Sequence, residues 1–167
     1  SRAVSKLFQY MPSLAHYNEY REPFLGGGSV ALEVTKRYPA LDIWVNDLYE
    51  PLYNFWCELR DHGQALRDEL FELKQQWSTP DLARTLFDSS KEYLGRPVED
   101  TKDFQRAVSF YVVNKCSFSG LTESSSFSAQ ASESNFSFAG IDRLPEYQEL
   151  IKDWRITNLS YEHLLTD

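Results

Sequence analysis

The sequence predicts a mixed α/β fold in which a small parallel sheet is interrupted by a long helical insertion. Strand patterns at 20–24 and 41–45 flank a helical pattern that begins at Ser29, and a third strand pattern lies at 155–158. Such a strand–helix–strand unit is typical of parallel pairing with a right-handed crossover. From Pro51 onward the pattern is mainly helical until the third strand. We therefore expect one α/β domain, with an incomplete sheet, that carries an inserted helical lobe.

The N-terminal part supplies the elements of the strand–helix–strand unit. Residues 1–11 form an amphipathic helix that ends at Pro12, and Ser29 can cap the next helix, which Pro39 ends. The second strand closes at Asn46-Asp47. The apolar positions on which these elements depend are Val4, Leu7, Phe8 and Met11, then Val30, Val34 and Tyr38, then Leu41, Ile43 and Val45.

Turn signals divide the insertion into four expected helices and one irregular stretch. Serine dominates residues 117–138, and phenylalanines recur through that polar background. A surface loop is one interpretation; the other is that the phenylalanines pin the segment to the body or await a partner. The helices are expected over 52–59, over 66–77, from Thr79-Pro80 through Tyr93, and from a cap at Asp100 or Thr101 through Val112, followed after the loop by helices at 144–154 and 161–165.

Composition limits the kinds of partner. The net charge is −8 and the pI about 4.9, so the overall charge does not favour a polyanion. Cys57 and Cys116 lie within apolar helical patterns without metal-ligand spacing, which predicts free thiols and no metal site. No apolar stretch has the length of a membrane span, and no signal peptide is recognisable. We expect a cytoplasmic protein without a membrane contact.

Three consecutive glycines follow the first strand and indicate a nucleotide-like ligand. Without a Cβ, Gly26 to Gly28 allow a tight turn and a close approach to peptide groups. Asp47, at the end of the next strand, is placed to bond ribose hydroxyls. Gly26, Gly28 and Ala31 also satisfy the G-x-G-x-x-G/A pattern of dinucleotide sites, whereas no G-K-[ST] of a P-loop follows. A plain mobile turn, with Asp47 as a helix cap or turn acid, is the structural alternative.

Glu22 distinguishes between the possible ligands. It stands directly before the glycine loop, where a carboxylate would repel the pyrophosphate of a dinucleotide from the helix N-terminus. An acid there suits a ligand with positive charge. S-adenosylmethionine carries a sulfonium and an amino group, together with a ribose for Asp47. The residues therefore favour S-adenosylmethionine over NAD.

Several stretches resemble the Dam-type (D12 class) adenine-specific DNA methyltransferases. Residues 21–30, R-E-P-F-L-G-G-G-S-V, are similar to the family's cofactor motif Y-x-E-P-F-x-G-x-G-x-V. Asn46-Asp47 resembles its second-strand acid. Residues 110–121 resemble its F-x-x-N-R-x-x-x-N-G-L segment, and 156–165 its N-x-D-[YF]-x-x-x-L strand. The resemblance implies a Rossmann-like S-adenosylmethionine-dependent fold that methylates adenine N6 in double-stranded DNA.

The same resemblance assigns regions and roles. Residues 1–55 and 145–167 become the cofactor-binding α/β domain, and 56–144 an inserted DNA-recognition region with its Ser/Phe-rich loop at 117–138. The implied cofactor residues are Glu22, Pro23, Phe24, Gly26 and Gly28 at the methionine end, Asp47 at the ribose, and Ser160 with Tyr161 beside the adenine; the implied DNA contacts are Lys115, Phe118 and Ser119.

Two motifs of the family have no counterpart in the sequence. Neither P-x-G-G-K, which contributes to the cofactor site, nor the catalytic D-P-P-Y is present, so no catalytic residue is assigned. The D-P-P-Y acceptors orient the target amine toward the sulfonium methyl. We therefore expect the chain by itself to be inactive. The alternatives are a catalytically inactive, methyltransferase-like binding or assembly module and, less favoured, an NAD-binding domain.

Overall fold

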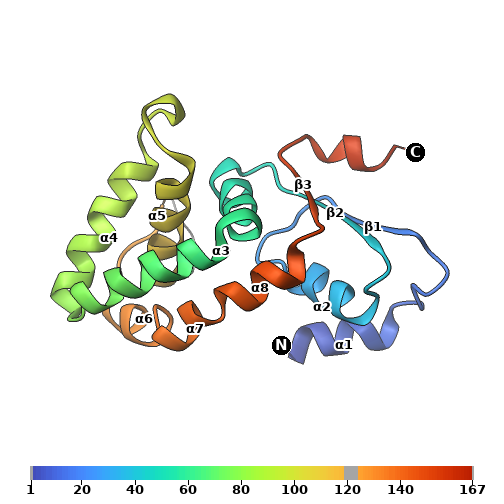
Figure 1. The fold of residues 1–167 in the computed structure, drawn as a ribbon, viewed down its shortest axis with the longest axis horizontal. Coiled ribbons are helices and arrows are strands. Elements are labelled where there is room, and N and C mark those ends of the chain that lie inside the picture. Colours follow the sequence, from blue (N-terminus) through green and yellow to red (C-terminus); the bar gives the residue numbers. More distant parts are fainter. Residues whose placement is uncertain (1, 119–123, 167) are drawn as a thin grey trace. The chain divides into compact units, whose positions relative to one another are not determined.

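The computed structural model describes residues 2–118 and 124–166, which fall into two compact units. One unit comprises Ser1–Tyr53 and Glu149–Asp167 and contains the sheet; the other comprises Asn54–Gln148 and contains helices. The chain enters the helical unit within α3 (Glu50–Gln76) and leaves it within α8 (Leu144–Ile151) (Figure 1). This organisation agrees with a helical segment inserted into an α/β unit.

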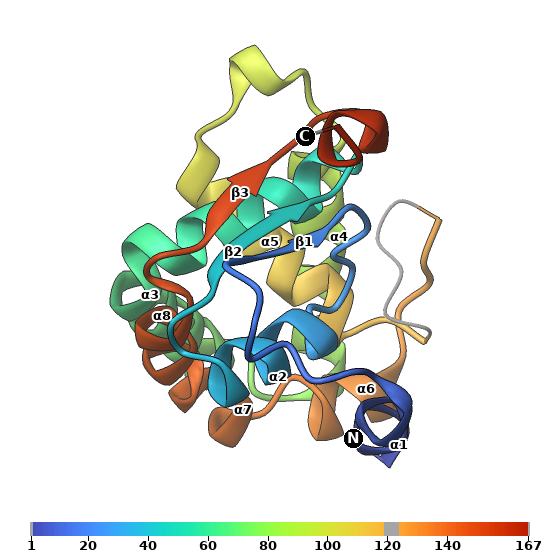
Figure 2. The same ribbon diagram turned by 90° about the vertical axis from the view of Figure 1, so that its right-hand side faces the viewer.

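The sheet is small and entirely parallel. Its strands β1 (Glu19–Glu22), β2 (Asp42–Asn46) and β3 (Arg155–Thr157) lie side by side in that order (Figure 2). Val45 pairs with Glu22 on one side and with Ile156 on the other. The predicted parallel strand–helix–strand unit is therefore confirmed, although β1 ends before Pro23 and so is shorter than expected.

Helix α2 (Ser29–Arg37) begins differently from the prediction. Ser29 was expected to cap it, but Gly28 is the N-cap residue, with a φ of 72°, and makes no side-chain capping bond. The reason is the left-handed conformation that only glycine adopts readily, which lets the chain enter the helix directly from the loop. The buried face consists of Ala31 and Val34, and Tyr38 lies at the C-cap. Helix α1 (Arg2–Tyr10) ends before Pro12 as predicted.

The helical unit contains α4 (Pro80–Leu94) and α5 (Asp103–Lys115), which pack against each other. Thr79 caps α4 as expected, because its hydroxyl accepts the Leu82 N–H at 3.3 Å. The expected cap of α5 at Asp100 or Thr101 is wrong: residues Val98–Asp100 form a 3-10 helix, η1, and the N-cap of α5 is Lys102 without a side-chain bond.

The described residues 124–138 of the serine-rich segment have more regular structure than their composition suggests. This segment contains α6 (Ala129–Ser134), and α7 (Phe138–Asp142) follows it. Phe136 is fully buried beside Tyr111, with a centroid separation of 6.2 Å. Phe127 contacts Phe87 at 5.6 Å, and Phe138 contacts Phe71 at 4.8 Å. Of the two interpretations, pinning is therefore confirmed for these three phenylalanines, and the purely irregular loop is wrong.

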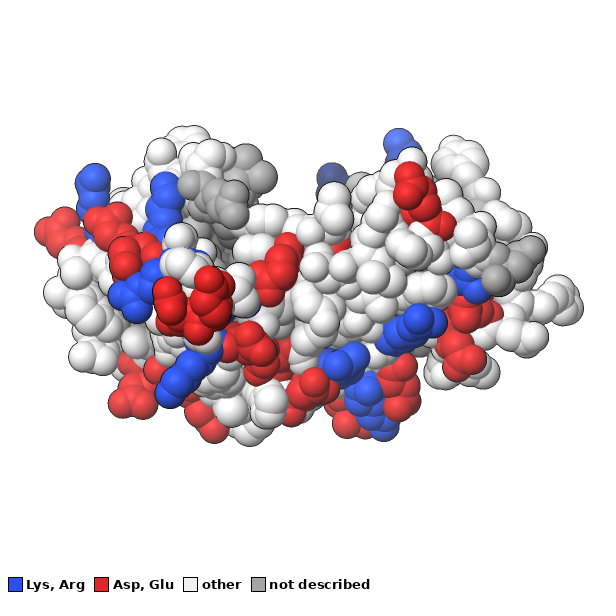
Figure 3. Space-filling view, turned by 90° about the horizontal axis from the view of Figure 1, so that it is seen from above, with Lys and Arg blue, Asp and Glu red and all other residues white. Residues whose placement is uncertain are grey.

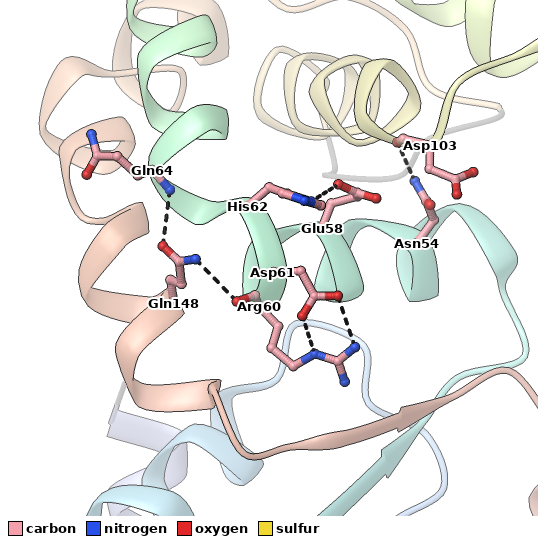
Figure 4. Close-up of polar contacts among 8 residues, drawn as sticks. All are labelled: Asn54, Glu58, Arg60, Asp61, His62, Gln64, Asp103 and Gln148. Atoms are coloured by element: carbon pink, nitrogen blue, oxygen red, sulfur yellow. Dashed lines mark hydrogen bonds and ion pairs between the residues drawn. The ribbon is translucent and has the colours of Figure 1, made fainter.

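Helix α3 contains a break where two separate helices were expected. Two helical parts are indeed present within Glu50–Gln76, as predicted, and they meet at a kink with non-helical angles at His62, where φ is −137° and ψ is 34°. At the break, the Gln148 carboxamide takes the place of a helical hydrogen bond. Its Oε1 accepts the Gln64 N–H at 3.1 Å, and its Nε2 donates to the Arg60 carbonyl at 3.3 Å (Figure 4). In a continuous helix these two backbone groups would bond each other.

Gly63 makes room for this bridge. A Cβ at Gly63 would lie 2.6 Å from the Cβ of Gln148, which is far inside a van der Waals contact. Gly63 is buried, so the larger side chain has no alternative space. The kink of α3 therefore depends on a glycine in the helix and on a glutamine eighty-four residues away in the sequence.

We expect Gln148→Leu to lower the free energy of unfolding by about 1–2 kcal/mol, since it removes the hydrogen-bond partner of two backbone groups. Urea unfolding followed by circular dichroism measures the change. The matched control is Gln64→Leu, which removes an exposed carboxamide bonded to Asp68 and leaves the bridge intact. Equal shifts of the two unfolding midpoints would contradict the bridging role.

Candidate functional site

The predicted cofactor residues of the α/β unit gather at the carboxyl ends of the three strands. The glycine loop follows β1, Asp47 follows β2, and Ser160 and Tyr161 follow β3. Parallel strands bring their carboxyl ends to one edge of a sheet, and ligands of such folds bind beyond that edge. These three segments therefore define the candidate site.

Asn46, the last residue of β2, joins the three segments. Its side chain is 1% exposed and makes four hydrogen bonds. Nδ2 donates to the carbonyls of Pro23 at 3.2 Å and Leu159 at 2.9 Å. Oδ1 accepts the Leu159 N–H and the Thr157 hydroxyl, both at 2.8 Å. The sequence prediction did not include Asn46 as a site residue; the available signal was an amide at the end of a buried strand.

Asp47 holds the glycine loop with its carboxylate. Oδ2 accepts the Gly26 N–H at 3.0 Å, and Oδ1 accepts the Tyr49 N–H at 2.9 Å. Asp47 therefore acts as a turn acid, as one of the two interpretations predicted, and this role is compatible with ligand binding. A carboxylate has about four acceptor positions, so two bonds leave capacity on both oxygens for ligand hydroxyls.

The glycine loop requires glycine and faces open space. Gly26 and Gly28 have φ angles of 51° and 72°, in the left-handed region. A Cβ at Gly26 or Gly27 would meet no atom within 4 Å. Steric clashes therefore do not explain why Gly26 and Gly27 are glycines. Gly26 is explained by its left-handed backbone, and the open space beside both residues leaves their peptide groups accessible to a ligand.

Glu22 ends β1 and lies at the N-terminus of α2. Its Oε2 accepts the Tyr20 hydroxyl at 3.1 Å, and the carboxylate also accepts the Ala31 N–H. Burial raises the pKa of Glu22 above its ordinary value of 4.5, and burial together with the Glu22 charge raises the pKa of Tyr20. The helix N-terminus is thus already occupied by a carboxylate, which disfavours a pyrophosphate at this place.

Two aromatic rings lie at the edge of the site. The centroids of Phe24 and Tyr161 are 5.6 Å apart at an interplanar angle of 36°, and the residues are 67% and 44% exposed. Ser160 is the N-cap residue of the 3-10 helix η2 (Tyr161–Leu164), and its hydroxyl donates to Glu162 at 3.0 Å. Residues that are far apart in the sequence therefore form one partly exposed aromatic surface.

The predicted DNA contacts belong to the helical unit. Lys115 ends α5, with its Nζ 5.6 Å from the centre of the Tyr111 ring, and burial lowers its pKa. Phe118 is 85% exposed, so its ring does not pack in the core. Its N–H donates to the Ser126 carbonyl at 3.2 Å. Ser119 lies outside the described residues.

Other kinds of site find no support in the described part of the chain. No group of three or more metal-ligating side chains occurs in the ranges 2–118 and 124–166. The described cysteines Cys57 and Cys116 are thiols and form no disulfide, and burial raises the pKa of the Cys116 thiol to about 12. None of the described helices combines the length and the apolar character of a membrane span. On the face drawn in Figure 3, acidic and basic side chains are interspersed.

Comparison with known proteins identifies the family of the chain. The chain is 23% identical over 105 residues to the type II methyltransferase M.MjaIII of Methanocaldococcus jannaschii. The match covers 62% of this chain and 36% of that protein, so the chain spans about a third of the length of this relative. The family model of the D12 class N6 adenine-specific DNA methyltransferases matches residues 1–167. The chain therefore belongs to the D12 class N6 adenine-specific DNA methyltransferase family.

Proposed function

We propose that this chain provides the cofactor site and the DNA-recognition region of an S-adenosylmethionine-dependent DNA adenine-N6 methyltransferase. The observation that carries the proposal is the pair of carboxylates, Glu22 and Asp47, beside a glycine loop in which Gly26 and Gly27 face open space. Two acids beside a nucleotide-like loop favour a ligand that joins a ribose to positive charge. S-adenosylmethionine has this combination without any phosphate, whereas NAD carries a pyrophosphate that Glu22 would repel.

Each predicted cofactor residue has a role in this proposal. Asp47 would accept hydrogen bonds from the ribose with the lone pairs that Gly26 and Tyr49 leave free. Glu22 would attract the amino group of the methionine end. The adenine would lie against the aromatic surface of Phe24 and Tyr161. The remaining members of the proposed site are Pro23, Gly28 and Ser160.

Chemically, the bound cofactor supplies a methyl group on a sulfonium. The residues of this chain bind the cofactor and exclude other ligands by charge. The D-P-P-Y acceptors that orient the adenine amine in the family have no match in this sequence, so we assign no catalytic residue to it. Methyl transfer to adenine in double-stranded DNA is therefore a proposal, and no step of that transfer is assigned to a residue of this chain.

Recognition of DNA is proposed for the helical unit. Phe118, three residues after Lys115, presents an exposed ring, and an aromatic side chain can stack on bases or wedge between them when a nucleotide is extruded. Ser119 is proposed as their neighbouring contact. The net charge of −8 means that DNA binding would depend on such local contacts and not on the overall charge.

The first test is isothermal titration calorimetry with S-adenosylhomocysteine and with NADH. We expect S-adenosylhomocysteine to bind and Asp47→Ala to weaken it at least about tenfold, because the ribose acceptor and the anchor of the loop are both lost. Asp42→Ala is the control, since Asp42 is an exposed acid at the other end of β2. Binding of NADH in place of S-adenosylhomocysteine would overturn the cofactor assignment.

The second test is the pH dependence of the same affinity. An ammonium group beside Glu22 favours the ionised carboxylate, so ligand binding lowers the raised pKa of Glu22. Affinity should therefore fall as the pH drops through that pKa toward 4.5, by roughly tenfold for each unit by which binding lowers it. Glu22→Gln should flatten the profile, whereas Glu33→Gln, at an exposed surface pair with Arg37, should not. An unchanged profile in Glu22→Gln would exclude this role.

The third test concerns DNA. Phe118→Ala should weaken binding of an adenine-containing duplex by about tenfold, as expected for loss of one stacking contact, and leave S-adenosylhomocysteine affinity unchanged. Fluorescence anisotropy of a labelled duplex measures it. The control is Val98→Ala, which removes another exposed apolar side chain of the helical unit. Equal duplex affinity of the wild type and Phe118→Ala would disprove the contact.

A further inference from the structure

The short helix η2, which carries Tyr161, is attached to the sheet at both ends. Before it, Leu159 bonds through both its N–H and its carbonyl to the Asn46 side chain. At the other end of η2, which closes with the buried residue Leu164, the Arg21 guanidinium provides the attachment. Its Nη1 donates to the Leu164 carbonyl at 3.1 Å and also to the Thr166 carbonyl. A single-turn 3-10 helix has little stability of its own, so these attachments determine its position.

Arg21 reaches these carbonyls from β1, an outer strand of the three described strands. It belongs to β1 and pairs with Trp44 of β2, and its guanidinium lies 5.0 Å from the centre of the Trp44 ring. Its Nε also bonds the Glu19 carboxylate. The ring and the carboxylate fix the guanidinium plane, and a planar guanidinium directs several donors at fixed angles. Arg21 is therefore oriented before it meets η2.

A second arginine provides a natural comparison. Arg155 of β3 also pairs with Trp44, and its guanidinium lies 3.8 Å from the centre of the same ring. The two arginines thus share one aromatic partner across three strands. The recorded contacts with the carbonyls of Leu164 and Thr166 come from Arg21. A comparison of substitutions at Arg21 and Arg155 therefore separates the effect of the bonds to the Leu164 and Thr166 carbonyls from the effect of the contact with Trp44.

The stack on Trp44 is connected to the Asn46 attachment as well. Trp44 Nε1 donates to the Thr157 hydroxyl at 2.9 Å, and that hydroxyl donates to Asn46 Oδ1 at 2.8 Å. The two attachments of η2 therefore belong to one continuous group of side chains on the sheet. A shift of the Trp44 ring would therefore displace the partners of η2 at both ends, Asn46 and Arg21.

We propose that Arg21 is a positioning residue that sets the place of Tyr161 and thereby the affinity for the adenosine part of the cofactor. The inference rests on the proposed function. Arg21 occupies the unspecified position of the Y-x-E-P-F motif, so the family resemblance assigns it no role. Without its bonds to the carbonyls of Leu164 and Thr166, η2 moves away from the sheet and the Phe24–Tyr161 contact is lost.

The test compares Arg21→Met with Arg155→Met. Both substitutions remove a cation from the face of Trp44, but only the first removes the recorded bonds to η2. We expect Arg21→Met to weaken S-adenosylhomocysteine and adenosine by the same factor, about tenfold, because adenosine contains the part of the ligand that Tyr161 would contact. Arg155→Met should stay within about twofold of the wild type.

Amide hydrogen exchange of residues 160–166 without ligand supplies an independent measurement. Exchange should accelerate in Arg21→Met, stay near the wild-type rate in Arg155→Met and slow again in Arg21→Lys, whose ammonium can still donate to one carbonyl. Equal exchange and equal affinities in the two methionine variants would overturn the inference. If the wild type binds no S-adenosylhomocysteine, the proposed function fails, and the exchange rates still decide whether Arg21 positions η2.

Discussion

The buried amide of Asn46 is the interaction on which the candidate site depends. The three strands contain only four, five and three residues, so their ladders alone fix the loops beyond them weakly. Asn46 adds four side-chain hydrogen bonds at that edge, to Pro23, Thr157 and Leu159. A buried amide that lost one partner would leave a polar group unsatisfied, at about 1–3 kcal/mol. This penalty enforces a single relative position of the segments after β1 and β3.

The charges of the site follow from this arrangement. Asn46 holds Pro23, which places Glu22 beside the start of α2 and the glycine loop beside Asp47. Burial makes the ionised form of Glu22 less favourable, as its raised pKa shows. A cationic ligand relieves that cost, whereas an anion at the same helix terminus increases it. In the proposed function, the same carboxylate that lies at the N-terminus of α2 would therefore also select the charge of the ligand.

Local features were predictable from the sequence, and distant contacts were not. The strand–helix–strand unit, the glycine loop and the end of the second strand depend on short-range periodicity and on glycine. The caps expected at Ser29 and at Asp100 or Thr101 failed because capping depends on backbone angles that residue type alone does not determine. Arg21 and Gln148 were missed because their partners lie far along the chain, 143 residues away for Arg21 and Leu164. Asn46 was missed for the same reason.

The helical unit shows how an acidic protein can present an aromatic side chain for recognition. Lys91 donates to the Ser125 carbonyl and Lys74 to the Ser132 carbonyl, each at 2.8 Å, and Phe127 packs on Phe87. These contacts use two lysines to hold a serine-rich segment, so each of these ammonium groups is bonded to a backbone carbonyl of the protein. What they provide is order: the backbone of Phe118 is bonded to this pinned segment, while its ring stays exposed. Because that backbone is already ordered, stacking on a base would require little further loss of conformational entropy.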